Sequence, residues 1–268
     1  MDDILISRAA ASDQPQLHKH WQTVFGDPTE LILAFFDCFP PEISAWTVRC
    51  GDEIFSAAYL IPGNWFMNGT QLRPAGYVYA VATPENHRGH GYAGRLMHTI
   101  AAEANERELL LYTRPAEASL FPWYAKTMSA GSAGHMREIV VRKDPSAACL
   151  PCRKLTYEEY GIARERLLRD VPHIVCSERF LRLQNRYSEG FFAVSNVLCC
   201  CTMQEQRLLI SECLGPEESF ALTAQTMMEY LGPDSAVIRT ETPDGALPSA
   251  AYCASDLPDN THWGLFLE

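Results

Sequence analysis

The residues best suited to chemistry lie in one loop, where Arg88 stands beside two glycines. The loop follows an apolar, β-branched and aromatic run from Gly76 to Thr83, which is typical of a strand. After the loop, apolar residues recur at the spacing of one buried helix face. These residues are Ala93, Leu96, Met97, Ile100 and Ala104. The sequence therefore predicts a strand, a glycine-rich loop and a helix.

A loop of this kind is suited to binding a phosphate. Glycine has no Cβ atom that would keep a ligand away from the backbone. The first N–H groups of the helix have no partner within it, and the helix dipole is positive at that end. Together with the arginine, these donors predict a site for a phosphate-bearing ligand. The predicted site comprises Arg88, Gly89, His90, Gly91, Tyr92 and Ala93.

The string from Gly89 to Gly94 also matches the GxGxxG fingerprint of dinucleotide-binding folds. In those folds the first glycine follows the strand almost at once, whereas residues 84–88 intervene here. The next apolar run ends at Thr113 and Arg114 instead of an acidic residue, and an arginine there suits a 2′-phosphate. An NADP-dependent oxidoreductase is therefore an alternative, and the relative binding of CoA and NADPH would decide it.

Residues 82–93 resemble the diagnostic motif of the GNAT superfamily of acyl-CoA N-acyltransferases, V-x-P-x-x-R-G-x-G-x-A. Arg88, Gly91 and Ala93 fill its R-x-x-G-x-A core. Further along, residues 120–126 resemble the helix of that family whose tyrosine, here Tyr124, faces the thioester sulfur. The resemblance implies an α/β (α+β) GNAT fold with a mixed, splayed central sheet.

The same resemblance implies an N-acetyltransferase that moves an acetyl group directly from acetyl-CoA to a primary amine. The pantetheine arm of the coenzyme would pair with backbone groups of Ala80, Val81 and Ala82, where two strands splay apart. A backbone N–H near Val81 or Ala82 would polarise the thioester carbonyl. Tyr124 would protonate the departing thiolate, since the pKa of a tyrosine, ~10, lies near that of a thiol, ~8.5.

The group that takes the proton from the amine is open between two alternatives. Residues 71–83 contain no carboxylate, so a water relay is one of them. The other is the C-terminal carboxylate at Glu268, as in the multi-domain acetyltransferases of the enhanced-intracellular-survival type. This chain resembles those proteins, and we expect it to be without their third, sterol-carrier-like domain. No metal is expected, because the CxxC pair of Cys149 and Cys152 has no second pair.

The composition limits the class of protein and its partners. A chain of 268 residues with 47% hydrophobic residues can form one to two domains with a sizeable core. A net charge of −11 argues against a nucleic-acid partner. No apolar run approaches the ~18 residues of a membrane span, and the ten cysteines show no disulfide framework. We therefore expect a cytoplasmic protein that acts on a small-molecule or peptide amine, with neither nucleic acid nor membrane as partner. The sequence leaves the oligomeric state open.

The pattern of elements predicts two domains, 1–145 and 150–268, joined by a linker at 144–148. For the first, which would hold the acetyl-CoA site, we expect strands at 4–6, 46–48, 54–61, 71–83, 109–113 and 139–141. Helices are expected to end at Phe25 and before Pro40, and to cover the segment after the loop and residues 115–128. A hairpin is expected at Asn68 and Gly69.

The second domain repeats the element order of the first. We expect helices at 157–169, 177–184 and 216–231, and strands at 191–202, 208–214, 236–240, around Tyr252 and at 263–267. Pro216, Glu217 and Glu218 stand where a glycine loop would be, so we expect a degenerate GNAT-like domain without a CoA loop. It would cover the acceptor side of the first. A non-catalytic acyl-CoA sensor or partner-binding module is the other alternative, and the identity of the amine is open.

Overall fold

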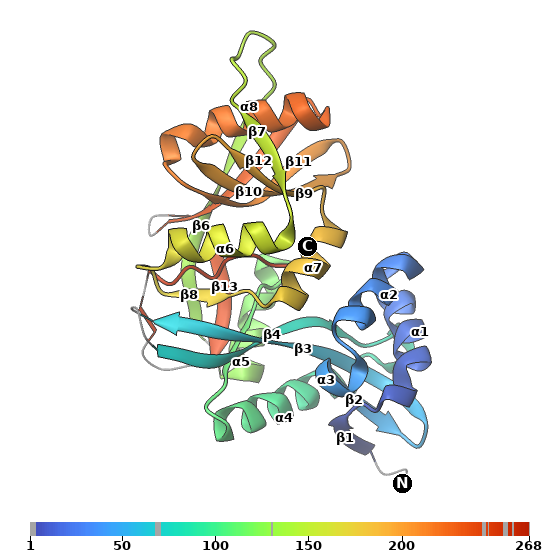
Figure 1. The fold of residues 1–268 in the computed structure, drawn as a ribbon. Coiled ribbons are helices and arrows are strands. Elements are labelled where there is room, and N and C mark those ends of the chain that lie inside the picture. The colour runs from blue at the N-terminus through green and yellow to red at the C-terminus, as the bar shows by residue number, and fades with distance from the viewer. Residues whose placement is uncertain are drawn as a thin grey trace. The chain divides into compact units, whose positions relative to one another are not determined.

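The protein is described here from a computed structural model, which covers residues 4–67, 71–129, 131–242, 245, 247–253, 257–258 and 260–267 (Figure 1). The chain forms two compact units. The first unit is Met1–Trp65, Leu72–Ala133 and Ala250–Leu257; the second unit is Phe66–Gln71, Gly134–Ser249 and Pro258–Glu268. Within the described residues, no helix is long and apolar enough to cross a membrane.

Each unit contains a segment that is distant in the sequence. We assigned residues 134–145 to the first domain, but they lie in the second unit, because the strand they form pairs with residues 235–241. Residues 250–257 lie in the first unit, where residues 251–253 pair with residues 111–113. The division therefore follows strand pairing and not a single linker.

The first unit contains five helices and three short 3-10 turns among its described residues. The helices are α1 (Gln14–Phe25), α2 (Thr29–Cys38), α3 (Pro41–Ser44), α4 (Tyr92–Glu106) and α5 (Phe121–Met128). The 3-10 turns are η1 (Ala11–Asp13), η2 (Glu85–His87) and η3 (Ala118–Leu120). The left-handed Gly26 ends α1, as the sequence predicts. Pro41 was expected only to end a helix, but it begins α3, since the first turn of a helix tolerates proline.

The sheet of the first unit is mixed. Its strands, in spatial order, are β1 (Ile4–Arg8), β2 (Ala45–Cys50), β3 (Glu53–Met67), β4 (Gln71–Ala82), β5 (Leu110–Thr113) and β13 (Leu247–Cys253). The pairs β1–β2 and β2–β3 are antiparallel, whereas β4 and β5 are parallel. This order differs from the repeated parallel units of a dinucleotide-binding domain. The expected hairpin at Asn68 and Gly69 lies outside the described residues.

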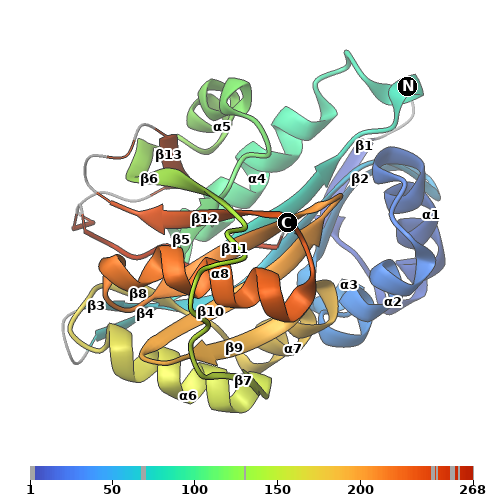
Figure 2. The same ribbon diagram turned by 90° about the horizontal axis from the view of Figure 1, so that it is seen from above.

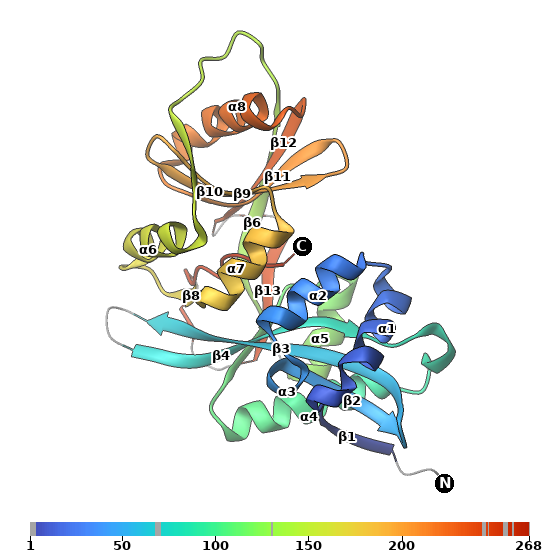
Figure 3. The ribbon, with the colours of Figure 1, turned by 45° about the vertical axis from the view of Figure 1, so that its right-hand side comes forward.

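The two faces of this sheet have different covers (Figure 3). On one face, Leu96, Met97 and Ile100 of α4 pack with Leu60 and Val78 of the sheet. The opposite face is covered by aromatic residues of α1 and α2 that contact the tyrosines of β3 and β4. The helix residues are Trp21 and Phe35, and the strand residues are Tyr59 and Tyr79. Neighbouring rings lie 4.8–5.8 Å apart.

The second unit has the same kind of architecture. Its strands, in spatial order, are β6 (Gly131–Arg142), β12 (Ser235–Glu241), β11 (Arg207–Leu214), β10 (Val197–Gln204), β9 (Gly190–Val194) and β7 (Cys152–Leu155) (Figure 2). Its other elements are α6 (Tyr157–Leu168), β8 (His173–Val175), α7 (Glu178–Tyr187), η4 (Glu217–Ser219) and α8 (Phe220–Leu231). Helix α8 lies on one face of the sheet and α6 on the other (Figure 1).

Two predictions for this unit were wrong. The strand expected at 191–202 is two strands, because Ser195 adopts φ 53° and turns the chain between β9 and β10. The strand expected at 263–267 is absent, and only His262 next to it forms an isolated bridge, with His173. Strands β7 and β8 were missed because each is too short to show an alternating pattern.

A buried charge network lies between α6 and the sheet of the second unit. Arg164 is fully buried and donates to both carboxylate oxygens of Glu212, at 3.0–3.2 Å. Tyr160 donates to the same carboxylate at 2.5 Å. His262 joins Glu212 to Glu241, with each of its ring nitrogens 2.8 Å from a carboxylate. Two cations thus face two anions, which compensates for their desolvation.

The pKa values follow from this arrangement. Burial alone would raise the pKa of Glu212, but the charge of Arg164 and the hydrogen bonds hold it well below its usual range. Burial alone would lower the pKa of His262, but the charge of Glu241 and the hydrogen bonds to both carboxylates raise it to about 9. His262 is therefore an imidazolium at neutral pH.

We predict that His262 makes the stability of the protein pH-dependent. Its pKa is about 9 in the folded chain and ~6.5 when unfolded, so its contribution is complete below pH ~6.5 and is lost as the pH rises through about 9. Replacing His262 with Gln should lower the free energy of unfolding by up to about 3 kcal/mol more at pH 6 than at pH 9.5. Urea unfolding at the two pH values measures this difference, and equal losses would contradict it.

Candidate active site

The predicted glycine loop is an open turn at the start of α4. Gly89 and Gly91 adopt φ +83° and +74°, a conformation that side chains disfavour. A Cβ atom added at either position would meet no protein atom within 4 Å, so the glycines are required by backbone conformation and not by crowding within the protein. Gly91 is the N-cap of α4 and offers no side chain to the first N–H groups of the helix. These groups are therefore available to an anion.

An aromatic side chain of β3 packs against the residues of the loop. The ring of Phe55 stacks on His87 at 4.4 Å and lies 5.1 Å from Tyr92. His87 Nε2 lies 3.0 Å from a carboxylate oxygen of Glu53, so that His87 pairs within the protein. His90 in turn stacks on Tyr92 at 5.5 Å. The loop is thus fixed before any ligand binds. No sequence pattern predicts a role for Glu53 and Phe55, because only folding brings β3 next to the loop.

Two hydrogen bonds fix the chain between β4 and the loop. Arg88 Nε donates to the carbonyl of Thr83 at 3.0 Å, which uses one of the five guanidinium N–H donors. Ser56, which is fully buried, donates to the carbonyl of Ala82 at 2.9 Å. The carbonyl of Ala82 is therefore already engaged, although we expected this residue to offer its backbone to a ligand.

Strands β4 and β5 separate in front of the loop. Their parallel ladder has its last pair at Tyr77 and Tyr112. Thr113 then ends β5, and its hydroxyl donates to the carbonyl of Val78 at 2.8 Å. Strand β4 continues to Ala82, so residues 79–82 have no ladder partner in β5. The strands form a fork whose apex is Val78 and Thr113.

A bulge lies in the open part of β4. Ala80 adopts φ 46°, which is unfavourable for a residue with a side chain and is found where the surrounding structure enforces it. Val78 and Val81 both pack on the α4 face although they are three residues apart, which regular alternation forbids. The bulge therefore turns backbone groups of residues 79–81 out of the regular ladder direction. The sequence does not show this bulge, because alanine is no signal for a left-handed conformation.

Tyr124 of α5 reaches the apex of this fork. Its side chain is 9% exposed and packs in the core under α4. Burial raises the pKa of Tyr124 to about 12, and a hydrogen bond to the Thr113 side chain opposes that shift. The structure thus brings Tyr124 to the point where β4 and β5 part, and the phenol is protonated at neutral pH.

A carboxylate lies near the face of β4 that is opposite α4. Asp27, between α1 and α2, accepts a 2.7 Å hydrogen bond from the indole of Trp21. The pKa of Tyr79 is raised mainly by burial and further by the charge of Asp27. A negative charge therefore lies near the residue that precedes the bulge. The sequence analysis did not single out either residue.

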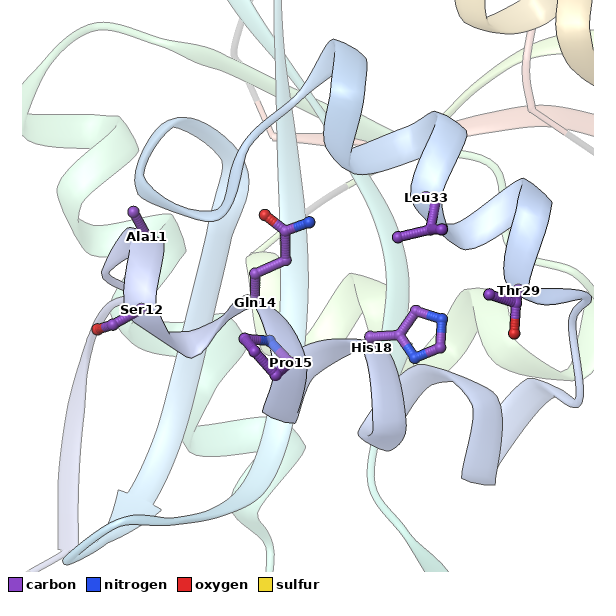
Figure 4. A pocket seen from close by; sticks show the side chains of 7 residues that line it. All are labelled: Ala11, Ser12, Gln14, Pro15, His18, Thr29 and Leu33. Atoms are coloured by element: carbon purple, nitrogen blue, oxygen red, sulfur yellow. The ribbon is translucent and has the colours of Figure 1, made fainter.

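A separate pocket of about 550 Å³ lies between α1 and α2, with Gln14, His18 and Leu33 among its lining residues (Figure 4). None of the residues predicted for coenzyme binding lines it. Glu268, the alternative proton acceptor, lies outside the described residues. The other predicted residues fall into two groups: those at the loop and α4 start, and those at the fork.

Comparison with protein families agrees with this geometry. The model of a family described as "Acetyltransferase (GNAT) domain" matches residues 6–126. This match contains β4, the loop, α4, β5 and Tyr124. Residues 6–126 therefore match a GNAT acetyltransferase domain, which supports an acyltransferase activity for the chain.

Solved structures share the fold over most of the chain. A probable N-acyltransferase from Enterococcus faecalis has a TM-score of 0.69 at 10% identity, covering 93% of this chain and 72% of its own. Eis1 from Mycobacterium abscessus has a TM-score of 0.60 at 11% identity, covering 88% of this chain and 65% of its own. A tandem GNAT protein from the clavulanic acid biosynthesis pathway has a TM-score of 0.55 at 12% identity, covering 93% and 97%. These identities show the fold alone. A search of curated proteins gave no match.

We predict opposite effects for two alanine substitutions at the start of α4. Gly91→Ala forces a side chain into the left-handed conformation and should destabilise the protein by ~1–2 kcal/mol. Gly94→Ala is the matched control, because its Cβ would make only an ordinary contact with Thr127 at 3.9 Å and alanine favours a helix by up to ~1 kcal/mol. Thermal unfolding of both variants measures the difference. A stable Gly91→Ala variant would show that the loop does not require the observed conformation.

Proposed function

We propose that the protein is an N-acetyltransferase that transfers an acetyl group from acetyl-CoA directly to a primary amine. The proposal rests on one observation above all: the fork between β4 and β5 has a bulged, unladdered strand on one side and the phenol of Tyr124 at its apex. The glycine loop stands at the open end of the same strand. A coenzyme with its diphosphate at the loop would extend its thioester toward the apex.

Each group then has a role. The N-terminal N–H groups of α4 and the guanidinium of Arg88 bind the diphosphate, with His90, Tyr92 and Ala93 around it. Backbone groups of Ala80 and Val81 pair with the pantetheine arm. The N–H of Val81 or Ala82 polarises the thioester carbonyl, which gains negative charge as the amine attacks. Tyr124 gives its proton to the departing thiolate.

In our proposal the amine enters from the face of β4 that carries Tyr79, beside the aromatic residues of α1 and α2, because Tyr124 reaches the fork from the α4 face. The carboxylate of Asp27 near Tyr79 favours a cationic acceptor on this face. An ammonium group must lose a proton before it attacks, and a water relay takes this proton in our proposal. Glu268 is the second proposed acceptor. The acceptor is a small-molecule or peptide amine in a cytoplasmic setting.

We predict that Tyr124→Phe lowers kcat by at least about tenfold, because the thiolate then leaves without a proton. The affinity for CoA should stay within about twofold, since the ring and its packing are kept. Because the pKa of Tyr124 is about 12, wild-type kcat should show no alkaline loss from this group below pH ~10. Release of free thiol from acetyl-CoA with an amine library measures turnover. Unchanged turnover in the variant would remove Tyr124 from the mechanism.

We predict that Arg88→Ala weakens CoA binding by about tenfold or more, since a charged contact to phosphate is lost. Lys126→Ala, in the last turn of α5, is a matched control for removal of a cation and should leave binding unchanged. Titration calorimetry with CoA and with NADPH measures both variants. Tighter binding of NADPH than of CoA by the wild type would favour an oxidoreductase, and CoA binding without turnover on any amine would favour a sensor.

A further inference from the structure

The second unit contains a fork of its own between parallel strands. The ladder of β11 and β12 has its last pair at Ile210 and Ile238. Beyond this pair, β11 continues to Leu214 and β12 continues to Glu241. A helix, α8, connects the two strands, as α4 connects β4 and β5 in the first unit. The second unit therefore repeats the strand, helix and strand that build the candidate active site.

The bulge is repeated as well. Ile210 and Cys213 pack in the same core cluster under α8 although they are three residues apart. The ladder between β10 and β11 skips Ser211, since Cys201 pairs with Ile210 and Cys200 with Glu212. The distances along the chain match those of Val78 and Val81, so that Glu212 takes the position of Ala80. A small residue at the open fork of one unit is replaced by a buried carboxylate in the other.

This carboxylate is occupied by the chain itself. Glu212 receives hydrogen bonds from Tyr160 and Arg164 of α6 and lies 2.8 Å from His262 Nε2. The other ring nitrogen of His262 lies 2.8 Å from Glu241 at the end of β12. One imidazolium therefore joins the two strands beyond the point where their ladder stops.

The backbone around His262 is held at the same place. Trp263 N donates to the Glu241 carboxylate at 2.9 Å, while His262 exchanges hydrogen bonds with Pro172 and Ile174, at 2.7 and 3.0 Å. Gly264 adopts φ +77°, and a Cβ atom there would come within 2.4 Å of Arg164 Nη2. The residues that follow are buried, namely Leu265, Phe266 and Leu267. Residues 260–267 thus have no strand or helix of their own and are fixed by side chains of the fork.

We propose that residues 260–267 are an internal ligand of the second unit. Through His262 this segment closes the fork between β11 and β12, whereas the proposed function leaves the corresponding fork of the first unit open to acyl-CoA. The segment contains His262, the cation that pairs with the carboxylate of Glu212 at the bulge. The loop before α8 carries Pro216, Glu217 and Glu218, which repel a diphosphate. The second unit therefore binds a segment of its own chain and no coenzyme.

Charged side chains from three elements face His262. Glu212 and Glu241 are the anions, and Arg164 is the second cation. Tyr160 donates a hydrogen bond to Glu212. Next to it, His173 pairs with Glu165 at 3.0 Å. Removal of His262 takes away the cation that lies between Glu212 and Glu241, so the segment loses its charged contact with both strands.

Hydrogen exchange of the full-length protein, followed by mass spectrometry of its peptides, tests the proposal. In His262→Ala, peptides covering residues 260–267 should exchange at least about tenfold faster than in the wild type, while α4 peptides stay unchanged. His262→Gln keeps one hydrogen bond and should give an intermediate rate. Gly264→Ala leaves His262 in place but crowds Arg164, and should also speed exchange of the segment.

The control is His98→Ala, because His98 forms a hydrogen bond with the helix carbonyl of Gly94 and lies on the exposed side of α4. It should change the exchange of residues 260–267 by less than about twofold. If His262→Ala unfolds the whole unit, His262→Gln and Gly264→Ala decide. Wild-type exchange of the segment in both of these variants would overturn the proposal.

Discussion

The parting of β4 from β5 after Tyr77 and Tyr112 is the constraint on which the candidate site depends. A strand that is paired along its whole length has no backbone groups left for a ligand. Here β5 ends early, and the Thr113 hydroxyl satisfies the carbonyl of Val78 at the apex. The Thr113 side chain also forms a hydrogen bond with Tyr124, so the residue at the apex lies next to the phenol. One threonine thus connects the termination of a ladder with the position of an acid.

The proposed anion site does not follow from the net charge of the chain, which is −11. It is made of backbone N–H groups at the start of α4, a helix dipole and one arginine, all neutral or local. Contacts within the protein hold the loop and the end of β4 in place. Phe55 stacks on His87, Glu53 pairs with His87, and Ser56 donates to the carbonyl of Ala82. These side chains come from β3, so the antiparallel hairpin supplies the base on which the loop rests.

The sequence predicted the glycine loop, α4 and most strands of the first unit, because glycines, a helical face and alternation each leave a local pattern. It also placed Tyr124 on a helix close behind the motif. It missed the features that depend on contacts between residues distant in the sequence. These are the bulge at Ala80, the hydrogen bond of Thr113 at the fork, and the assignment of residues 134–142 to the second unit and of residues 250–253 to the first. The segment at 263–267 was taken for a strand because it is apolar, but it is buried without forming one, and the N–H of Trp263 donates to the carboxylate of Glu241.

The two forks show how one backbone plan leads to two outcomes. Both combine a short parallel ladder, a bulge and a connecting helix, and both leave backbone groups that require a partner. In the proposed active site, which has Ala80 at the bulge and glycines before the helix, the partner is the coenzyme from outside the chain. With Glu212 at the bulge and acidic residues before the helix, the partner must be a cation, and His262 supplies it from the same chain. The residue at the bulge therefore decides whether the fork is an open site or a structural joint.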